Sequence, residues 1–339
     1  MLIPQLRNKL VIAATLLCII NPSFAGTSKT SISFWDDDSR FINVPSAALY
    51  PEGLEYNAKT DEFILGSIRQ GKVIAVSPSG KVRTLIKDKR LKSVVGIRVD
   101  EKRGRLLINS ADFGVSERSK PSDKFSTVAV GIYDLATGEP IHYVNLADLR
   151  PNEKRFVNDL TVDDNGNAYV TDSLAAAIYK ITPNGEASVF LSDERFRGKG
   201  FNLNGIQYHK DGFLLVAKKS DGSLFKVPLD RPSAFTEVNV TPVVGTDGLV
   251  LAKNNELIAI TNKASGIESN TVFKLVSNDN WKSAQIKDNF KTGDVFPTTG
   301  IVKGDKIFVN YGRLNTLGKS LKEGKTLIQN FRIQEVGTL

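Results

Sequence analysis

The chain has 339 residues, of which 41% are hydrophobic and 24% charged, so it has enough apolar material for a folded core and is not of the disordered class. Its net charge at pH 7 is +8, but the lysines and arginines are scattered and do not alternate with aromatic residues, so we expect no nucleic-acid partner. The only cysteine is Cys18, which excludes a disulfide framework.

The first 25 residues have the features of a secretory signal peptide. Arg7 and Lys9 precede the apolar run 10–20, and Ser23-Phe24-Ala25 ends in a small residue that suits signal peptidase. The run is too short for a membrane span, and Leu17 before Cys18 does not suit lipoprotein processing. The sequence therefore predicts a periplasmic or secreted protein without a membrane anchor; the alternative is that the segment stays uncleaved as an anchor.

Six similar phrases follow, spaced 43 to 63 residues apart, and each opens a strand-like run. They are Glu52-Gly53-Leu54, Val95-Gly96-Ile97, Asn158-Asp159-Leu160, Asn204-Gly205-Ile206, Asp247-Gly248-Leu249 and Thr299-Gly300-Ile301. Repeats of this length, each with about four short strands, are typical of propeller blades. We therefore predict an all-β, six-bladed β-propeller that forms one domain over residues 26–339.

The third repeat shows the strand pattern most clearly. Strands are expected at 160–162, 168–172, 177–182 and 187–191, with turns at Asn165-Gly166 and Asn184-Gly185. In the second repeat, residues 113–124 form a polar insertion that we interpret as a surface loop, with a functional lid as the alternative. Residues 31–35 are expected to complete the last blade beside 327–333, which would close the ring.

Four of the six phrases carry an oxygen ligand at their first position. A propeller brings equivalent positions together, so Glu52, Asn158, Asn204 and Asp247 should converge. Two carboxylates and two amides suit a hard cation, Ca²⁺ or another divalent ion, and leave coordination positions for water and substrate. The two histidines, His142 and His209, do not lie at repeat starts, which disfavours zinc. The alternative is that these residues only shape turns.

The second strand of each blade should end at the same face, because it runs antiparallel to the first. This places a set of polar residues at the channel mouth: Arg69, Asp112, Asp172, Lys218, Lys219, Asn262, Lys263, Tyr311 and Arg313. The basic members of this set would attract an anionic substrate, or would form a solvated rim.

From Leu49 to Val309 the chain resembles the senescence marker protein, gluconolactonase and luciferin-regenerating enzyme family of calcium-dependent six-bladed propellers. The resemblance rests on Pro51-Glu52-Gly53, Asn158-Asp159, Asn204-Gly205 and Asp247-Gly248, in that order. It implies a calcium ion held by Glu52, Asn158, Asn204 and Asp247. It also implies a substrate-binding role for Arg155, although Val157 shifts this arginine by one position from the family's register.

These features, together with the activity that the resemblance implies, predict an exported calcium-dependent hydrolase that opens a lactone or related ester. Asp247 is the candidate base or nucleophile, and Arg69, Arg155, Lys218, Lys263 and Arg313 are the candidate substrate-binding residues. We expect a monomer that acts on a small molecule. The alternative is a non-catalytic, calcium-stabilised propeller that binds a protein or glycan.

Overall fold

Six four-stranded antiparallel sheets form the molecule in the computed structural model, which describes residues 41–264 and 266–338. Blade 1 consists of β2 (Pro51–Asn57), β3 (Glu62–Ser67), β4 (Val73–Val76) and β5 (Val82–Ile86). Blade 2 consists of β6 (Ser93–Asp100), β7 (Arg105–Ala111), β8 (Val128–Asp134) and β9 (Pro140–Asn145). Blade 3 consists of β10 (Val157–Val162), β11 (Ala168–Asp172), β12 (Ala177–Ile181) and β13 (Ala187–Ser192).

Blades 4 to 6 repeat the arrangement. Blade 4 consists of β14 (Leu203–His209), β15 (Phe213–Lys218), β16 (Leu224–Pro228) and β17 (Thr236–Glu237). Blade 5 consists of β18 (Thr246–Leu251), β19 (Leu257–Ala264), β20 (Ile267–Val276) and β21 (Gln285–Lys291). Blade 6 consists of β22 (Pro297–Lys303), β23 (Lys306–Tyr311), β24 (Asn330–Thr338) and β1 (Phe41–Pro45). The predicted six-bladed β-propeller is confirmed.

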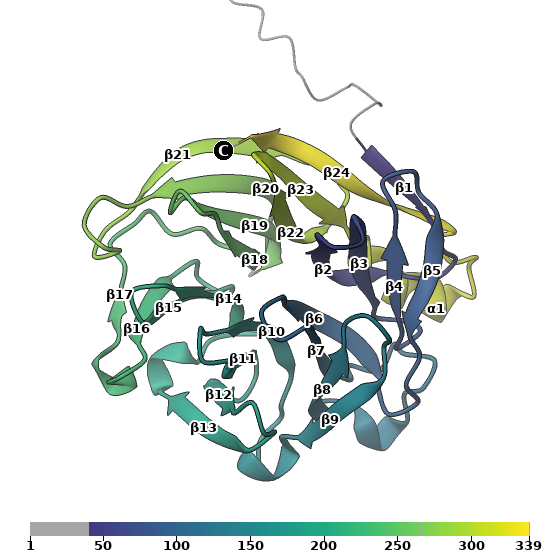
Figure 1. The fold of residues 1–339 in the computed structure, drawn as a ribbon, viewed down its shortest axis with the longest axis horizontal. Coiled ribbons are helices and arrows are strands. Elements are labelled where there is room, and N and C mark those ends of the chain that lie inside the picture. The colour runs from purple at the N-terminus through teal and green to yellow at the C-terminus, as the bar shows by residue number, and fades with distance from the viewer. Residues whose placement is uncertain (1–40, 265, 339) are drawn as a thin grey trace, which may run out of the picture. The chain divides into compact units, whose positions relative to one another are not determined.

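The first strand of each repeat is the innermost strand of its blade (Figure 1). Each inner strand contacts the inner strands of the two neighbouring blades, and β2 also contacts β22, which closes the ring. Apolar side chains from the faces of adjacent blades form the core, for example Leu65, Val170 and Ile333, all fully buried. Packing between blades thus positions the six inner strands around one channel.

Ring closure uses a different strand from the expected one. β1 pairs antiparallel with β24, from Phe41 opposite Gln334 to Pro45 opposite Asn330, and Val44 is fully buried. The N-terminal segment therefore supplies the outer strand of blade 6, which covers an edge that would otherwise be open. The expected strand at 31–35 and the boundary at residues 25 and 26 lie outside the described residues.

A helix and a loop with tertiary contacts lie between the strands of the propeller. Helix α1 (Leu314–Glu323) lies between β23 and β24, and Gly324 ends it in the left-handed conformation. The 113–124 insertion is tied to blade 1, since Arg118 donates to the carbonyl oxygens of Gly71, Asp88 and Leu91. Among the described residues, no helix is long and apolar enough to span a membrane.

Candidate functional site

Each repeated phrase is a β-bulge at the start of an inner strand. The pairing register between the first and second strands shifts there in all six blades, for example between Val157 and Leu160 and between Leu203 and Ile206. A bulge bends the strand and re-aims a side chain. The repeated phrase thus turns its first residue towards the mouth of the channel.

The bulges are held by buried polar side chains from neighbouring second strands. The amide of Asn109 donates to the carbonyl oxygen of Asn158 at 3.0 Å, and the hydroxyl of Thr171 donates to that of Asn204 at 2.7 Å. Asn310 donates to the Glu52 carbonyl oxygen at 3.2 Å. These bonds cross from one blade to the next, so each fixes the backbone of a candidate ligand.

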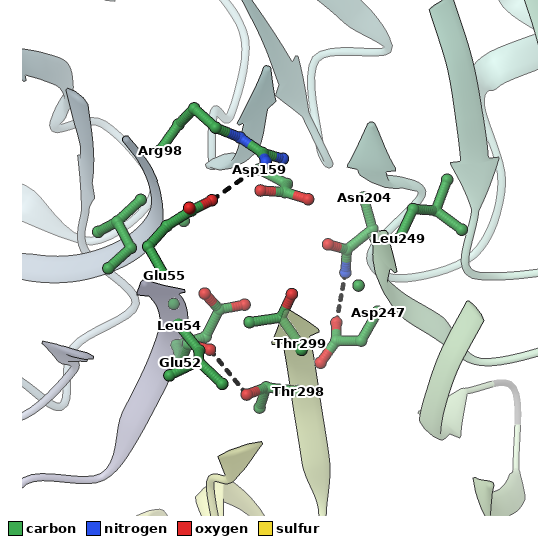
Figure 2. Close-up of a pocket in the computed structure, with 15 residues that line it drawn as sticks. Glu52, Leu54, Glu55, Arg98, Asp159, Asn204, Asp247, Leu249, Thr298 and Thr299 are labelled. Carbon is green, nitrogen blue, oxygen red and sulfur yellow. Dashed lines mark hydrogen bonds and ion pairs between the residues drawn. The ribbon is translucent and has the colours of Figure 1, made fainter. Parts of the chain in front are cut away.

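The four predicted ligands converge, as the repeat pattern indicated. Glu52, Asn158, Asn204 and Asp247 are 2–9% exposed and together line a cavity of about 230 Å³. Figure 2 shows Glu52, Asn204 and Asp247 pointing into the channel from different strands. In the described part of the chain, the buried side-chain oxygens of Asn158 and Asn204 have no hydrogen-bond partner. Buried amide oxygens without partners are unfavourable, so these two are available to a cation or to water.

Asp247 is surrounded by donors. The ammonium of Lys219 lies 2.7 Å from its Oδ1, which also accepts from the amide of Asn204, and its Oδ2 accepts from the amide of Asn262. Lys219 donates to Asn262 as well and is only 8% exposed. The sequence placed Lys219 and Asn262 at the mouth but did not predict their contacts with Asp247.

The oxygen atoms of the four ligand candidates suit a hard cation. Glu52 and the two unpartnered amide oxygens are oxygen ligands of the kind Ca²⁺ takes. A carboxylate has about four lone-pair sites, and three donors occupy Asp247, so one site on Oδ2 is left. The residues therefore fit a divalent cation, with Lys219 as a fixed positive charge beside it.

Ser173 orients the Asn158 side chain. The Asn158 amide donates to the hydroxyl of Ser173 at 2.9 Å, and that hydroxyl donates in turn to the Leu203 carbonyl oxygen. Asp159 instead accepts from the backbone of Leu160 at 2.8 Å. The Ser173 contact leaves the Asn158 oxygen free for a ligand.

A second polar group lies along the channel next to the four ligand candidates. Arg98 contacts Glu55 at 3.1 Å, and Figure 2 shows the Asp159 carboxylate beside the Arg98 guanidinium. Burial raises the pKa of Glu55 to about 7, although Arg98 opposes the change, and burial raises the pKa of Asp159 to about 6. Burial, followed by the charge of Asp247, raises the pKa of Glu52 well above its usual range. The channel therefore disfavours further negative charge.

Apolar side chains make up the other half of the cavity lining. They are Ile68, Val95, Phe113, Phe156, Phe201, Phe296 and Leu314. Phe113 comes from the 113–124 insertion and Leu314 from the start of α1. Neither contribution was expected from the sequence, because both elements lie outside the repeat.

The five predicted substrate-binding residues are not gathered in one place. Lys263 lines the cavity, but the other four do not. Arg69 donates to the carbonyl oxygen of Val115, and Arg155 donates to the carbonyl oxygen of Ser126. Lys218 forms an ion pair with Asp221 at 2.8 Å. Arg313 donates to the carbonyl oxygen of Asp294. Their role in substrate binding stays a prediction.

The two histidines lie away from the site. His142 is on the outer strand β9, and His209, at the end of β14, contacts Asn255 at 2.8 Å. Neither lines the cavity.

Comparisons with known proteins show the fold. No protein-family model and no curated protein matches the chain. Among solved structures, the Malassezia sympodialis allergen Mala s 1 matches 88% of this chain and 96% of its own length, with 16% identity and a TM-score of 0.70.

Two enzymes are also similar in structure. The luciferin-regenerating enzyme covers 88% of this chain and 96% of its own length, with 14% identity and a TM-score of 0.59. A gluconolactonase from Xanthomonas campestris covers 88% and 89%, with 15% identity and a TM-score of 0.57. The chain therefore has the gluconolactonase-like propeller fold at low sequence identity.

Proposed function

We propose that this protein is an exported, calcium-dependent hydrolase that opens a lactone or related ester. One observation carries the proposal: four repeat-start side chains converge on one cavity, and two of their buried amide oxygens lack partners. The similarity to a gluconolactonase supports the same class of reaction. Export rests on the features of residues 1–25 alone.

Hydrolysis at this site requires a base, a charge for the oxyanion and a proton for the leaving group. Asp247 would accept a proton from water at its remaining Oδ2 site as the water oxygen bonds to the carbonyl carbon, while Glu52 and the amide oxygens of Asn158 and Asn204 would hold the cation. Bound calcium would supply Lewis acidity. Lys219, 2.7 Å from Asp247, would stabilise the negative oxygen of the tetrahedral intermediate. When the ester C–O bond breaks, the proton held by Asp247 passes to the leaving oxygen, giving an acid and an alcohol.

The alternative is a calcium-stabilised propeller that binds a protein or glycan without turnover. Such a protein needs the same ligands but no room beside them. The cavity of about 230 Å³ next to Asp247 supports the enzyme instead, because a small molecule has access to the candidate base.

The test is calcium binding and ester hydrolysis by the mature protein and two variants. Glu52→Gln should lower calcium affinity at least about tenfold, because a charged ligand is lost. Asp247→Asn should retain weaker calcium binding and lose hydrolysis by about 10²-fold or more, because the base is lost. Calorimetry measures the first effect, and a lactone and aryl-ester panel measures the second.

Glu139→Gln and Asp148→Asn make the same chemical changes at exposed positions and should alter neither property. Calcium binding without any turnover would favour the binding platform. Undiminished hydrolysis by Asp247→Asn would remove Asp247 from the mechanism. Absence of calcium binding would mean that the four residues serve only the turns.

A further inference from the structure

The wall of the cavity indicates what kind of molecule the site takes. Four phenylalanines line it, and they come from blades 2, 3, 4 and 6: Phe113, Phe156, Phe201 and Phe296. Phe156 packs edge-to-face against Phe113, with ring centroids 5.6 Å apart, and against Phe201 at 5.1 Å. We call these four residues the phenylalanine wall.

The phenylalanine wall is not simply part of the sealed core. Phe113, Phe201 and Phe296 are each only partly buried, and all three border the cavity. Several partly exposed rings around one cavity would be unfavourable in water unless a ligand covered them.

A sugar lactone would suit this wall poorly. Its hydroxyl groups need hydrogen-bond partners, and a phenylalanine ring supplies none. Four of the five basic residues that the sequence offered for such contacts are held by carbonyl oxygens or an aspartate outside the cavity. The polar lining consists of the four ligand candidates, Lys219, Lys263 and Asn315. The Asn315 amide donates to Asp294, and Lys219 lies at Asp247, where it suits a single carbonyl group.

We propose that the substrates are hydrophobic lactones or esters, whose carbonyl group lies at Asp247 and Lys219 and whose aryl or alkyl group packs on the phenylalanine wall. This inference rests on the proposed function and names its substrate class. The cavity, at about 230 Å³, is smaller than the roughly 300 Å³ of typical drug-sized sites, so one ring or a short chain would fill it.

A homologous series of γ-lactones tests the proposal: γ-butyrolactone and its ethyl, butyl and hexyl derivatives, with glucono-δ-lactone as the polar comparison. If each added methylene is buried, kcat/KM should rise about fourfold per methylene until the cavity is full. Glucono-δ-lactone should be the poorest substrate. Hydrolysis is followed by proton release, with and without calcium.

Phe201→Ala should flatten the dependence of kcat/KM on the length of the alkyl chain, because the ring no longer covers the added methylenes. The matched control is Phe190→Ala, since Phe190 is equally partly buried but packs on Tyr169 outside the cavity. The control should keep the full dependence. A flat series in the wild type, or glucono-δ-lactone as the best substrate, would overturn the inference while leaving the hydrolase intact.

Calorimetry with the butyl lactone separates this inference from the proposed function. If no lactone is hydrolysed but the butyl lactone binds, and Phe201→Ala alone weakens binding, the hydrolase fails and the apolar site stands. If the wild type neither binds nor hydrolyses the series, both proposals fail.

Discussion

At the scale of single residues, the contact between Lys219 and Asp247 matters most for the site. Glu52 and Asp247 bring two negative charges, and the buried ammonium of Lys219 cancels one of them. A divalent ion at this site would therefore meet a net charge of only −1 on the protein. Calcium would bind less tightly but would stay more electrophilic towards a substrate oxygen.

Lys219→Met should raise calcium affinity on the order of tenfold, because a like charge beside the ion is removed. It should also lower kcat by about 10²-fold, because the oxyanion loses a donor. Calorimetry and steady-state kinetics measure the two changes. Lys218→Met is the control, since Lys218 is paired with Asp221 outside the cavity. Unchanged calcium affinity in Lys219→Met would show that the ammonium lies too far from the ion to matter.

At the scale of elements, the repeated glycine has a steric role beside the bulge. A Cβ atom on Gly53 would lie 2.6 Å from the Val95 carbonyl oxygen, and one on Gly96 would lie 2.4 Å from that of Asn158. At these two positions the neighbouring inner strands approach too closely for a side chain. Glycine stands at this position in five of the six phrases, and the third phrase has Asp159 there.

Gly205→Ala should reduce the free energy of unfolding by about 1–3 kcal/mol. The new Cβ would lie 2.7 Å from the backbone nitrogen of Leu249, and backbone does not move aside easily. Denaturant unfolding measures the change. Gly318→Ala in α1 is the control, because nothing lies within 4 Å of the new atom and alanine favours a helix. Equal stability of Gly205→Ala and the wild type would show that the strands can separate without penalty.

At the scale of the whole molecule, the ring encloses carboxylates that no single blade would bury. Glu55 lies on β2, Arg98 on β6 and Asp159 on β10, and they meet only because the blades close around the channel. Burial raises the pKa of Glu55 from 4.5 to about 7. The folded state therefore holds this proton more tightly than the unfolded chain does.

Stability should accordingly fall as the pH rises from about 4.5 to 7, because ionised Glu55 is disfavoured only in the folded state. Between pH 5 and pH 8, the free energy of unfolding of Glu55→Gln should fall by about 1–3 kcal/mol less than that of the wild type. Denaturant unfolding across this range measures the slope for both proteins. Because glutamine resembles protonated glutamate, the two should be similar at pH 5. Parallel profiles would mean that Glu55 stays ionised throughout.

The repeat pattern was sufficient to predict the propeller, its inner strands and the four converging ligand candidates. Hydrophobic alternation and turn residues act locally, so each blade can be read from its own residues, and a closed ring then places equivalent positions together. The strands of the third repeat, for example, match β10 to β13 within three residues at each end. The phenylalanines were visible in the sequence, but nothing in their spacing indicated a common wall.

Only the tertiary structure decided the chemistry around those ligands. In the folded chain Lys219 contacts Asp247, whereas Lys218 and three other predicted basic residues contact partners outside the cavity. The strand β1 completes blade 6, and Phe113 and Leu314 line the cavity. These features depend on side-chain direction and on contacts between segments far apart in the chain. The periodicity of hydrophobic residues predicts which face of a strand is buried, but it does not predict which residue a charged side chain contacts there.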